Sequence, residues 1–187
     1  LVAYESACSL ATTGATILKD DPERDPWQDA YDLMRDLHLT AAQAAVRNGQ
    51  FEMVEQLLGA IDQRSQSALD SAATSQVRMF SFYFQGNHAE ACVAALHALR
   101  RLGIRLPARP RNRDVLAAVA RTRLAMLGRP IRSLASLPPM TDERSSKALE
   151  IMAAATISAA SVEPKLLMII GLEMVWQTVR HGMHPLS

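Results

Sequence analysis

The sequence predicts an all-α protein, a stack of antiparallel helix hairpins, and three observations lead to this fold class. Residues that favour helices dominate the 187 positions, whereas aromatic residues, which favour strands, make up only 5%. Apolar residues recur three and four positions apart along most of the chain. Glycine or proline interrupts each of these runs, so we expect eight or nine helices and no strand.

The N-terminal half is predicted to hold five helices separated by short turns. Pro22 and Pro26 are expected to keep the polar turn between the first two helices non-helical. Gly49 and Gly86 provide the left-handed residues that end the second and the fourth helix. Phe80–Phe84 looks strand-like over five residues, but its helical context favours a helix. The predicted ranges are 2–18, 27–48, 51–63, 67–85 and 89–102.

The C-terminal half is predicted to be less regular. Gly103 closes the fifth helix, and a bend with two prolines follows it. Pro138 and Pro139 forbid helix continuation, and Thr141 is the expected N-cap of the long helix behind them. The predicted elements are helices at 114–127, 142–161 and 164–182 and a short helical turn at 131–137.

We expect a single helical domain over 1–187. It divides into regular hairpins at 1–103, an irregular Arg- and Pro-rich centre at 104–141 and a final helix pair at 142–187. The chain begins at Leu1 without an initiator methionine and stops just after a helix-like run. It is therefore expected to be a fragment of a larger protein.

The chain is expected to be cytoplasmic, without membrane insertion. Its N-terminus lacks the basic and then apolar pattern of a signal peptide. The longest uncharged stretch, 151–162, is too short to cross a bilayer. Cys8 and Cys92 each lie in an apolar helical pattern, which predicts small buried thiols rather than a disulfide or a metal pair.

Two of the predicted hairpins share a pattern with a period of 37 residues when Gly49 is aligned with Gly86. Two antiparallel helices can approach closely only where small residues face each other. One such hairpin cannot bury its apolar stripe alone, so the hairpins are expected to stack. The corresponding positions are Ala42, Ala45, Phe51, Val54, Leu58 and Ile61 in the first hairpin and Met79, Phe82, His88, Ala91, Ala95 and Ala98 in the second.

This pattern resembles the tetratricopeptide repeat, in which small residues, a turn glycine and an aromatic residue two positions later recur. The resemblance implies a right-handed α-solenoid. The chain departs from the family in its period of 37 residues, against about 34 in the family. It also lacks the closing proline, and His88 stands where the first hairpin has Phe51.

A longer ordered set of motifs runs from Trp27 to Ser187. Its members are Trp27 with Tyr31, the two Gly hairpins, Leu102-Gly103-Ile104 with Leu106-Pro107, Gly128-Arg129-Pro130-Ile131, Leu134, Leu137-Pro138-Pro139-Met140-Thr141-Asp142 and His181-Gly182 with Pro185-Leu186-Ser187. This set resembles the helical region that follows the ATPase domain in very large bacterial signalling proteins of the sensor histidine kinase or Ser/Thr kinase type. The resemblance implies a regulatory spacer or docking platform.

We expect no catalytic site, cofactor or metal in this chain. Lysine occurs only at positions 19, 147 and 165, and none follows the glycine pattern of a phosphate-binding loop. His181 and His184 are spaced like two metal ligands, but they are expected to be solvated residues at a helix end. An ATPase or kinase activity is expected elsewhere in the parent protein.

The first candidate partner-binding surface lies on the helices that precede Gly49 and Gly86. Successive helix residues point about 100° apart, so the aromatic residues of 80–84 cannot all face one core. By analogy with the repeat family, two of them are expected to face the concave side, opposite polar residues of the preceding hairpin. The alternative is that neighbouring helices of the same domain fill this groove. The candidates are Asp36, Gln43, Arg47, Gln76, Phe80 and Tyr83.

The second candidate is a cluster of ten arginines between Arg100 and Arg132, in which Asp114 is the single acid. Residues 1–93 carry a net charge of −7 and residues 94–187 a net charge of +8. Docking onto a protein or an adjacent domain of the same chain is favoured over nucleic acid, because no aromatic residue within 100–132 could stack on bases. The further alternative is an ordinary solvated surface. The docking candidates are Arg105, Arg109, Arg111, Arg113 and Arg121.

These observations predict a non-catalytic scaffold for protein–protein or domain–domain coupling within a multidomain signalling ATPase or kinase. The alternative is a helical scaffold of a large ATP-dependent transcription regulator, in which the arginine face assists DNA binding. Salt-dependent binding to duplex DNA separates the two functions.

Overall fold

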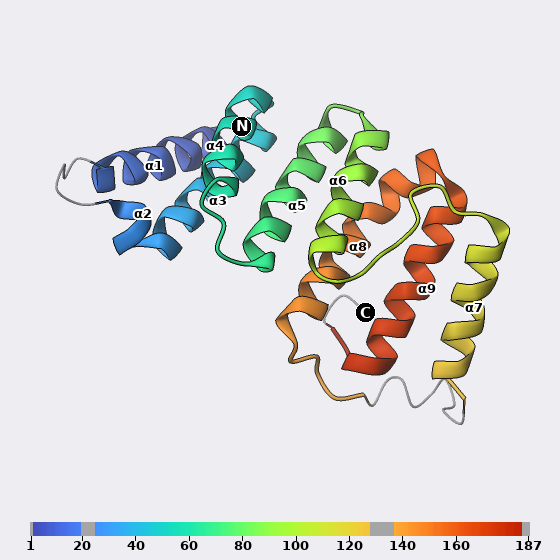
Figure 1. The fold of residues 1–187 in the computed structure, drawn as a ribbon. Coiled ribbons are helices and arrows are strands. Elements are labelled where there is room, and N and C mark those ends of the chain that lie inside the picture. The colour runs from blue at the N-terminus through green and yellow to red at the C-terminus, as the bar shows by residue number, and fades with distance from the viewer. Residues whose placement is uncertain (1, 20–24, 128–136, 185–187) are drawn as a thin grey trace. The chain divides into compact units, whose positions relative to one another are not determined.

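The structure is a computed structural model, and it describes residues 2–19, 25–127 and 137–184. Within these ranges it contains nine α-helices and one isolated backbone bridge, which confirms the all-α prediction (Figure 1). The helices fall into two compact units, Leu1–Asn87 (unit 1) and His88–Ser187 (unit 2). The predicted single domain, its boundaries after 103 and 141 and the right-handed α-solenoid stay predictions.

Unit 1 is built around its third helix, which contacts the first, the fourth and the fifth. The fourth and fifth helices also pack against each other. Successive hairpins therefore share helices inside this unit. Its elements are α1 (Val2–Lys19), α2 (Pro26–Asp29), α3 (Tyr31–Arg47), α4 (Phe51–Asp62) and α5 (Ala68–Phe84).

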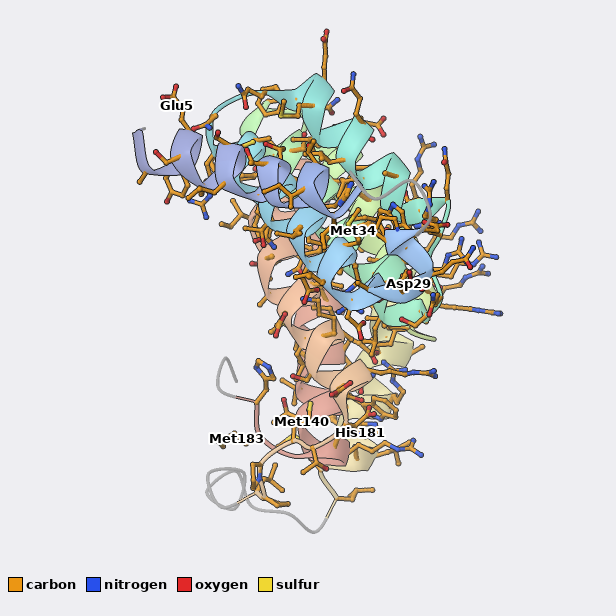
Figure 2. The ribbon with its side chains drawn as sticks, turned by 90° about the vertical axis from the view of Figure 1, so that its left-hand side faces the viewer. Glu5, Asp29, Met34, Met140, His181 and Met183 are labelled. Carbon is orange, nitrogen blue, oxygen red and sulfur yellow. The ribbon has the colours of Figure 1, made fainter. Side chains whose placement is uncertain are left out.

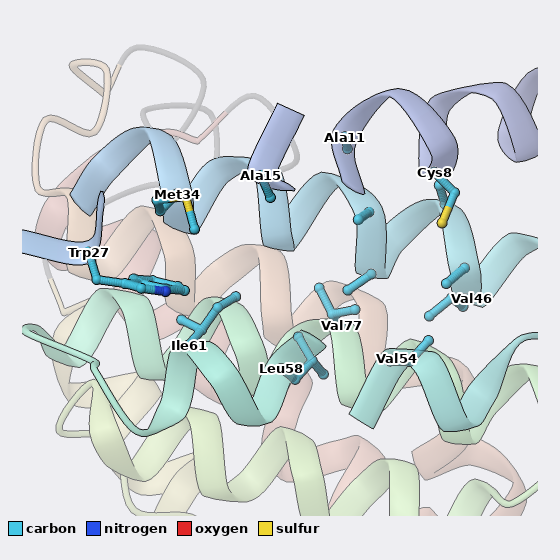
Figure 3. Packing of buried hydrophobic residues seen from close by; sticks show 14 residues of the cluster. Cys8, Ala11, Ala15, Trp27, Met34, Val46, Val54, Leu58, Ile61 and Val77 are labelled. Atoms are coloured by element: carbon cyan, nitrogen blue, oxygen red, sulfur yellow. The ribbon is translucent and has the colours of Figure 1, made fainter. Parts of the chain in front are cut away.

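The core of unit 1 lies between α1, α3 and α4 (Figure 3). Met34, Val54, Leu58 and Ile61 are all fully buried there. Alanines on α3 let the helices approach closely, because a methyl group leaves little space between backbones. The predicted apolar stripes of these helices are thus confirmed. The buried alanines of α3 are Ala41, Ala42, Ala44 and Ala45.

The single helix predicted over 27–48 is wrong, because the backbone breaks at Ala30 (φ −139°, ψ 46°). The polar turn predicted before Trp27 lies mostly outside the described residues; Asp25 is non-helical, and Pro26 is the first residue of α2 rather than the last of the turn. A proline at this position loses no hydrogen bond, because the first N–H groups of a helix have no partner inside it. The Asp25 carboxylate caps α2 by accepting a hydrogen bond from the Trp27 N–H at 3.0 Å.

Three helices end in the same way, each with a glycine at positive φ: Gly49 (74°), Gly86 (75°) and Gly103 (92°). In each case the next N–H donates to a carbonyl five residues earlier, as Gln50 does to Ala45 at 2.9 Å. The glycine turns predicted from the sequence are confirmed. Phe80–Phe84 lies inside α5, so the preference for a helix there is confirmed as well.

The described residues of unit 2 form four helices, and the first and second of these do not form a tight hairpin. The segment 102–111 crosses the unit and returns the chain to the end where the first helix began (Figure 1). In space α8 packs against α6 and α9, and α9 packs against α7. The elements are α6 (His88–Arg101), α7 (Asn112–Ala125), α8 (Glu143–Val162) and α9 (Pro164–His181).

The start of α8 and the end of α9 are tied together by backbone hydrogen bonds. The Met140 N–H donates to the Met183 carbonyl at 2.9 Å, and the Met183 N–H donates to the Pro138 carbonyl at 2.8 Å. Figure 2 shows Met140 and Met183 side by side near His181. Gly182, at φ 104°, makes the close approach possible, because a Cβ there would collide with the Pro138 carbonyl oxygen.

The predicted N-cap of the long helix is displaced by one residue. Asp142, not Thr141, caps α8, and its side chain accepts from the Ser145 N–H at 2.9 Å. Hydrogen bonds from the Ser145 hydroxyl and from the Ser145 N–H lower the pKa of Asp142. An ionised carboxylate is favoured beside the positive end of a helix, which explains the choice of Asp over the neighbouring Thr. The helical turn predicted at 131–137 falls on residues outside the described ranges, except for Leu137.

Candidate functional site

The candidate site is a groove in unit 2 on both sides of the connecting segment 102–111. Two hollows of about 500 and 370 Å³ make up this groove, which we call the arginine groove. Arg105 and Leu106 line both hollows. The larger hollow is completed by α7 and Ile169 of α9, and the smaller one by Leu96, His97 and Arg100 of α6.

Local sequence explains why the connecting segment lies where it does. Gly103 turns the chain out of α6 at positive φ, and Pro107 and Pro110 keep the following residues from forming a helix. Pro110 is buried, which holds the segment against the unit. The Arg111 N–H then donates to the Asp114 carboxylate at 2.7 Å, which fixes the first turn of α7.

The arginines of the connecting segment are exposed and have no acidic partner among the residues that the structure describes. This holds for Arg105, Arg109 and Arg111. Arg113 lies 3.7 Å from Asp114, but its side chain is 76% exposed, so this pair is weak. Unit 2 contains 14 Lys and Arg against 7 Asp and Glu, a net charge of +7. Of these arginines only Arg105 lines the two hollows, and Arg109 and Arg111 lie on the same segment outside them, so within the described residues the groove and its surroundings carry an excess of positive charge.

Arg121, the fifth docking candidate, also lines the larger hollow, but its guanidinium already has a partner. It donates to the Glu173 carboxylate, which is buried at 2% exposure and also accepts from Gln177 Nε2 at 2.9 Å. This pair joins α7 to α9. Arg121 therefore holds a wall of the groove and is not a free docking residue, which the sequence alone did not indicate.

An aromatic ring lies against these arginines, contrary to the absence of a stacking platform expected from positions 100–132. Trp176 of α9 lies 4.7 Å from the Arg121 guanidinium and 5.1 Å from that of Arg180, measured to the ring centroid. His181 approaches the same ring edge-on at 6.5 Å. Sequence reasoning missed Trp176 because it is more than fifty positions from Arg121, and only the packing of α7 on α9 joins them.

The first candidate surface lies in unit 1, and the fold brings some of its residues close to one another. α3 and α5 are in contact, so the two halves of the predicted set lie on neighbouring helices. Arg47 is exposed and lies over the Phe84 ring at 5.5 Å and the Tyr4 ring at 5.8 Å. The sequence singled out Phe80 and Tyr83 instead. Tyr4 and Phe84 are 44% and 48% exposed, and both were missed.

The remaining members of that set have ordinary surroundings. The Asp36 carboxylate is ion-paired with Arg35 at 3.0 Å, so it is occupied inside its own helix. Gln43 is exposed, Gln76 is half-buried and Phe80 is 37% exposed. Tyr83 packs edge-on against Phe84 at 5.5 Å between ring centroids. These positions form a surface but show no convergent polar site.

Unit 1 uses two of its arginines in internal ion pairs. Asp70, buried on α5, accepts hydrogen bonds from Arg35 at 3.1 Å and from the Tyr31 hydroxyl at 3.0 Å. Burial favours the neutral Asp70 carboxyl, but hydrogen bonds from Ser67 and Tyr31 and the charge of Arg35 outweigh it and lower its pKa. Arg78 joins α4 to α5 in the same way, through Glu55 at 2.9 Å and Asp62 at 3.1 Å.

The cysteines and the terminal histidines show no reactive centre. Cys8 and Cys92 are buried and not in a disulfide, as predicted, and burial raises the pKa of both thiols. The expectation that His181 and His184 are solvated is wrong: His184 is buried, 3.9 Å from Glu150, and His181 packs on Trp176. Across the part of the chain that is described, no three His, Cys, Asp or Glu side chains are grouped as metal ligands.

Comparisons with known proteins find no match, whether against family models, curated proteins or solved structures. None of the helices in the described ranges combines the length and the apolar character needed to span a membrane.

Proposed function

We propose that this chain is a non-catalytic scaffold that couples partner proteins or neighbouring domains within a multidomain, cytoplasmic bacterial signalling protein of the ATPase or kinase type. The observation that carries the proposal is the arginine groove. Arg105, Arg109 and Arg111 are exposed and have no acidic partner among the described residues, on the segment between α6 and α7. Uncompensated charge on a fixed surface favours recognition of an oppositely charged partner and sets its orientation.

The assignment to a kinase- or ATPase-containing parent rests on the motif resemblance and not on the groove. The helices would hold the flanking domains at a set geometry, and docking at the groove would shift when a signal changes the partner. Such coupling requires a partner whose affinity differs between two states.

The test is a calorimetric titration of this chain with the flanking domains of its parent protein, produced separately. We expect binding that weakens from low to physiological salt, because exposed charges are screened. Combined reversal of Arg105, Arg109 and Arg111 to Glu should abolish it while the circular dichroism spectrum stays unchanged. Binding that is indifferent to both salt and charge reversal would remove the groove from the proposed function.

The second candidate function is assistance to DNA binding in a large ATP-dependent transcription regulator, and the Trp176 contacts favour it. They place an aromatic ring beside two arginines, Arg121 and Arg180. Titration of the chain into duplex DNA at increasing salt concentration decides whether this second function holds. Tight binding that falls steeply with salt supports the DNA function, whereas no binding at low salt eliminates it.

A further inference from the structure

We propose that the arginine groove recognises a short peptide segment in which an acidic residue is flanked by two large apolar side chains. The inference rests on the proposed docking function and names the chemistry of the docked segment. It begins from the division of the groove into two hollows with Arg105 and Leu106 common to both.

The walls of both hollows combine apolar and polar side chains. In the larger one, Pro107, Ala117, Ala118 and Ile169 form the apolar part, beside Arg105, Asp114 and Arg121. In the smaller one, Leu96 and Ala108 lie beside His97, Arg100 and Arg105, and Leu106 lines both hollows. Volumes of about 500 and 370 Å³ lie within the range of about 300–1,000 Å³ found for ligand pockets. Each hollow can therefore receive a large apolar side chain, whose burial supplies hydrophobic free energy.

Arg105 stands between the two hollows and supplies the polar contact. Its guanidinium has five donors and no ion pair within the described ranges. A carboxylate placed between the two apolar side chains would accept two of these hydrogen bonds in the planar geometry that arginine favours. The net charge of +7 on unit 2 attracts an acidic segment.

A nucleic acid fits the same groove less well. The lining side chains Leu96, Leu106 and Ile169 have no complement in a phosphate backbone. The Trp176 ring beside the groove wall is already in contact with Arg121 and Arg180. A peptide with acidic and apolar side chains can contact both Arg105 and the two hollows, whereas a polyphosphate can contact only the arginine.

The experiment measures fluorescence anisotropy of labelled peptides on the whole chain. The test peptide has a Leu-Glu-Leu core, and two matched peptides replace it with Ser-Glu-Ser or Leu-Gln-Leu. We expect the test peptide to bind and each matched peptide to bind about tenfold more weakly, because each lacks one of the two contacts. Equal binding of the Ser-Glu-Ser peptide, or no binding of the test peptide, overturns the inference.

Substitutions of Arg105 test whether this residue contacts the peptide carboxylate. Arg105→Ala should weaken the test peptide about tenfold, the effect of losing one charge-assisted hydrogen-bonded pair. Arg123→Ala is the matched control, because Arg123 is also exposed and lies on α7 but does not line either hollow. A peptide with a Leu-Lys-Leu core should bind Arg105→Glu better than the unchanged chain. An equal loss in both Ala variants would indicate diffuse attraction and overturn the inference.

Failure here can be separated from failure of the proposed function. If the test peptide does not bind but the chain still binds its flanking domains, the inference about peptide chemistry is wrong and the docking function stands. If neither binds, both are wrong. Competition of the labelled peptide by duplex DNA alone, with no loss in Arg105→Ala, would assign the surface to nucleic acid and also overturn the inference.

Discussion

The two units use their charged residues in opposite ways. Unit 1 has 6 Lys and Arg against 12 Asp and Glu, and its ion pairs at Arg35 and Arg78 join helices to one another. Unit 2 has an excess of arginine, and apart from Arg121 its groove arginines have no acidic partner in the described ranges. Arginine side chains thus join helices to one another in unit 1, whereas in unit 2 most of them are exposed on the surface.

The helix pairs differ as well. In unit 1 a short glycine turn at Gly49 joins α3 to α4, and α3 packs on α1, α4 and α5. In unit 2 the long segment 102–111 replaces the turn between α6 and α7, and a backbone bridge between Pro139 and Met183 closes the α8–α9 pair. Four variants test this comparison, from the largest expected effect to the smallest.

The largest effect is expected for Gly182→Ala in unit 2. The new Cβ would collide with the Pro138 carbonyl oxygen and would also need a positive φ, so we expect a loss of about 3 kcal/mol in the free energy of unfolding. Gly49→Ala is the control, since its turn has the same sign of φ but nothing within 4 Å, and it should cost about 1 kcal/mol. Urea denaturation followed by circular dichroism measures both. Equal losses of stability in the two variants would show that the backbone does not approach Gly182 closely at the Pro139–Met183 bridge.

Arg121→Met tests the ion pair between Arg121 and Glu173 at the groove. It leaves the Glu173 carboxylate buried without its cation, and because the Arg121 side chain is itself 46% exposed, we expect a loss of about 2 kcal/mol. Adding Glu173→Leu should restore most of this stability, since no buried charge then remains. Arg123→Met, which has no ion pair in the described ranges, serves as the control and should change little.

Asp70→Asn tests the ion pairs of unit 1 through their pH dependence. Because the pKa of Asp70 is lowered in the folded state, its contribution is present above about pH 4 and is lost as the pH falls through the folded pKa. We expect Asn to cost about 1.5 kcal/mol at pH 7 and much less near pH 2. Thermal denaturation across this range, with exposed Asp29→Asn beside it, measures the difference. A pH-independent loss would contradict the ionised role of Asp70.

The smallest effect is expected for the combined variant Arg105→Gln, Arg109→Gln and Arg111→Gln. These side chains are exposed and make no ion pair in the described ranges, so the free energy of unfolding should change by less than about 0.5 kcal/mol. A slight gain at low salt is consistent with reduced repulsion among like charges. A large loss by urea denaturation would mean that these arginines stabilise unit 2, and the comparison between the units would fail.

Features that depend on local chemistry were predictable from the sequence. Gly49, Gly86 and Gly103 end helices where their freedom at positive φ suggested, and Phe80–Phe84 follows its helical surroundings. The break at Ala30 was missed because neither glycine nor proline marks it.

Features that depend on tertiary packing were not predictable. Glu173 and Trp176 reach Arg121 only because α9 packs on α7. Of the groove itself, Arg105 could be proposed from charge alone. The apolar hollows beside it required the path of the connecting segment.

The segment 102–111 also bears on how this protein could diversify. Since the helices of unit 2 are held by α8 and α9, residues between Gly103 and Pro110 could be exchanged with little disturbance to the core. A transplant of this loop from a related chain would then transfer partner preference as one piece. Substitution of a few exposed residues in this segment could thus change the specificity of docking while the helices stay unchanged.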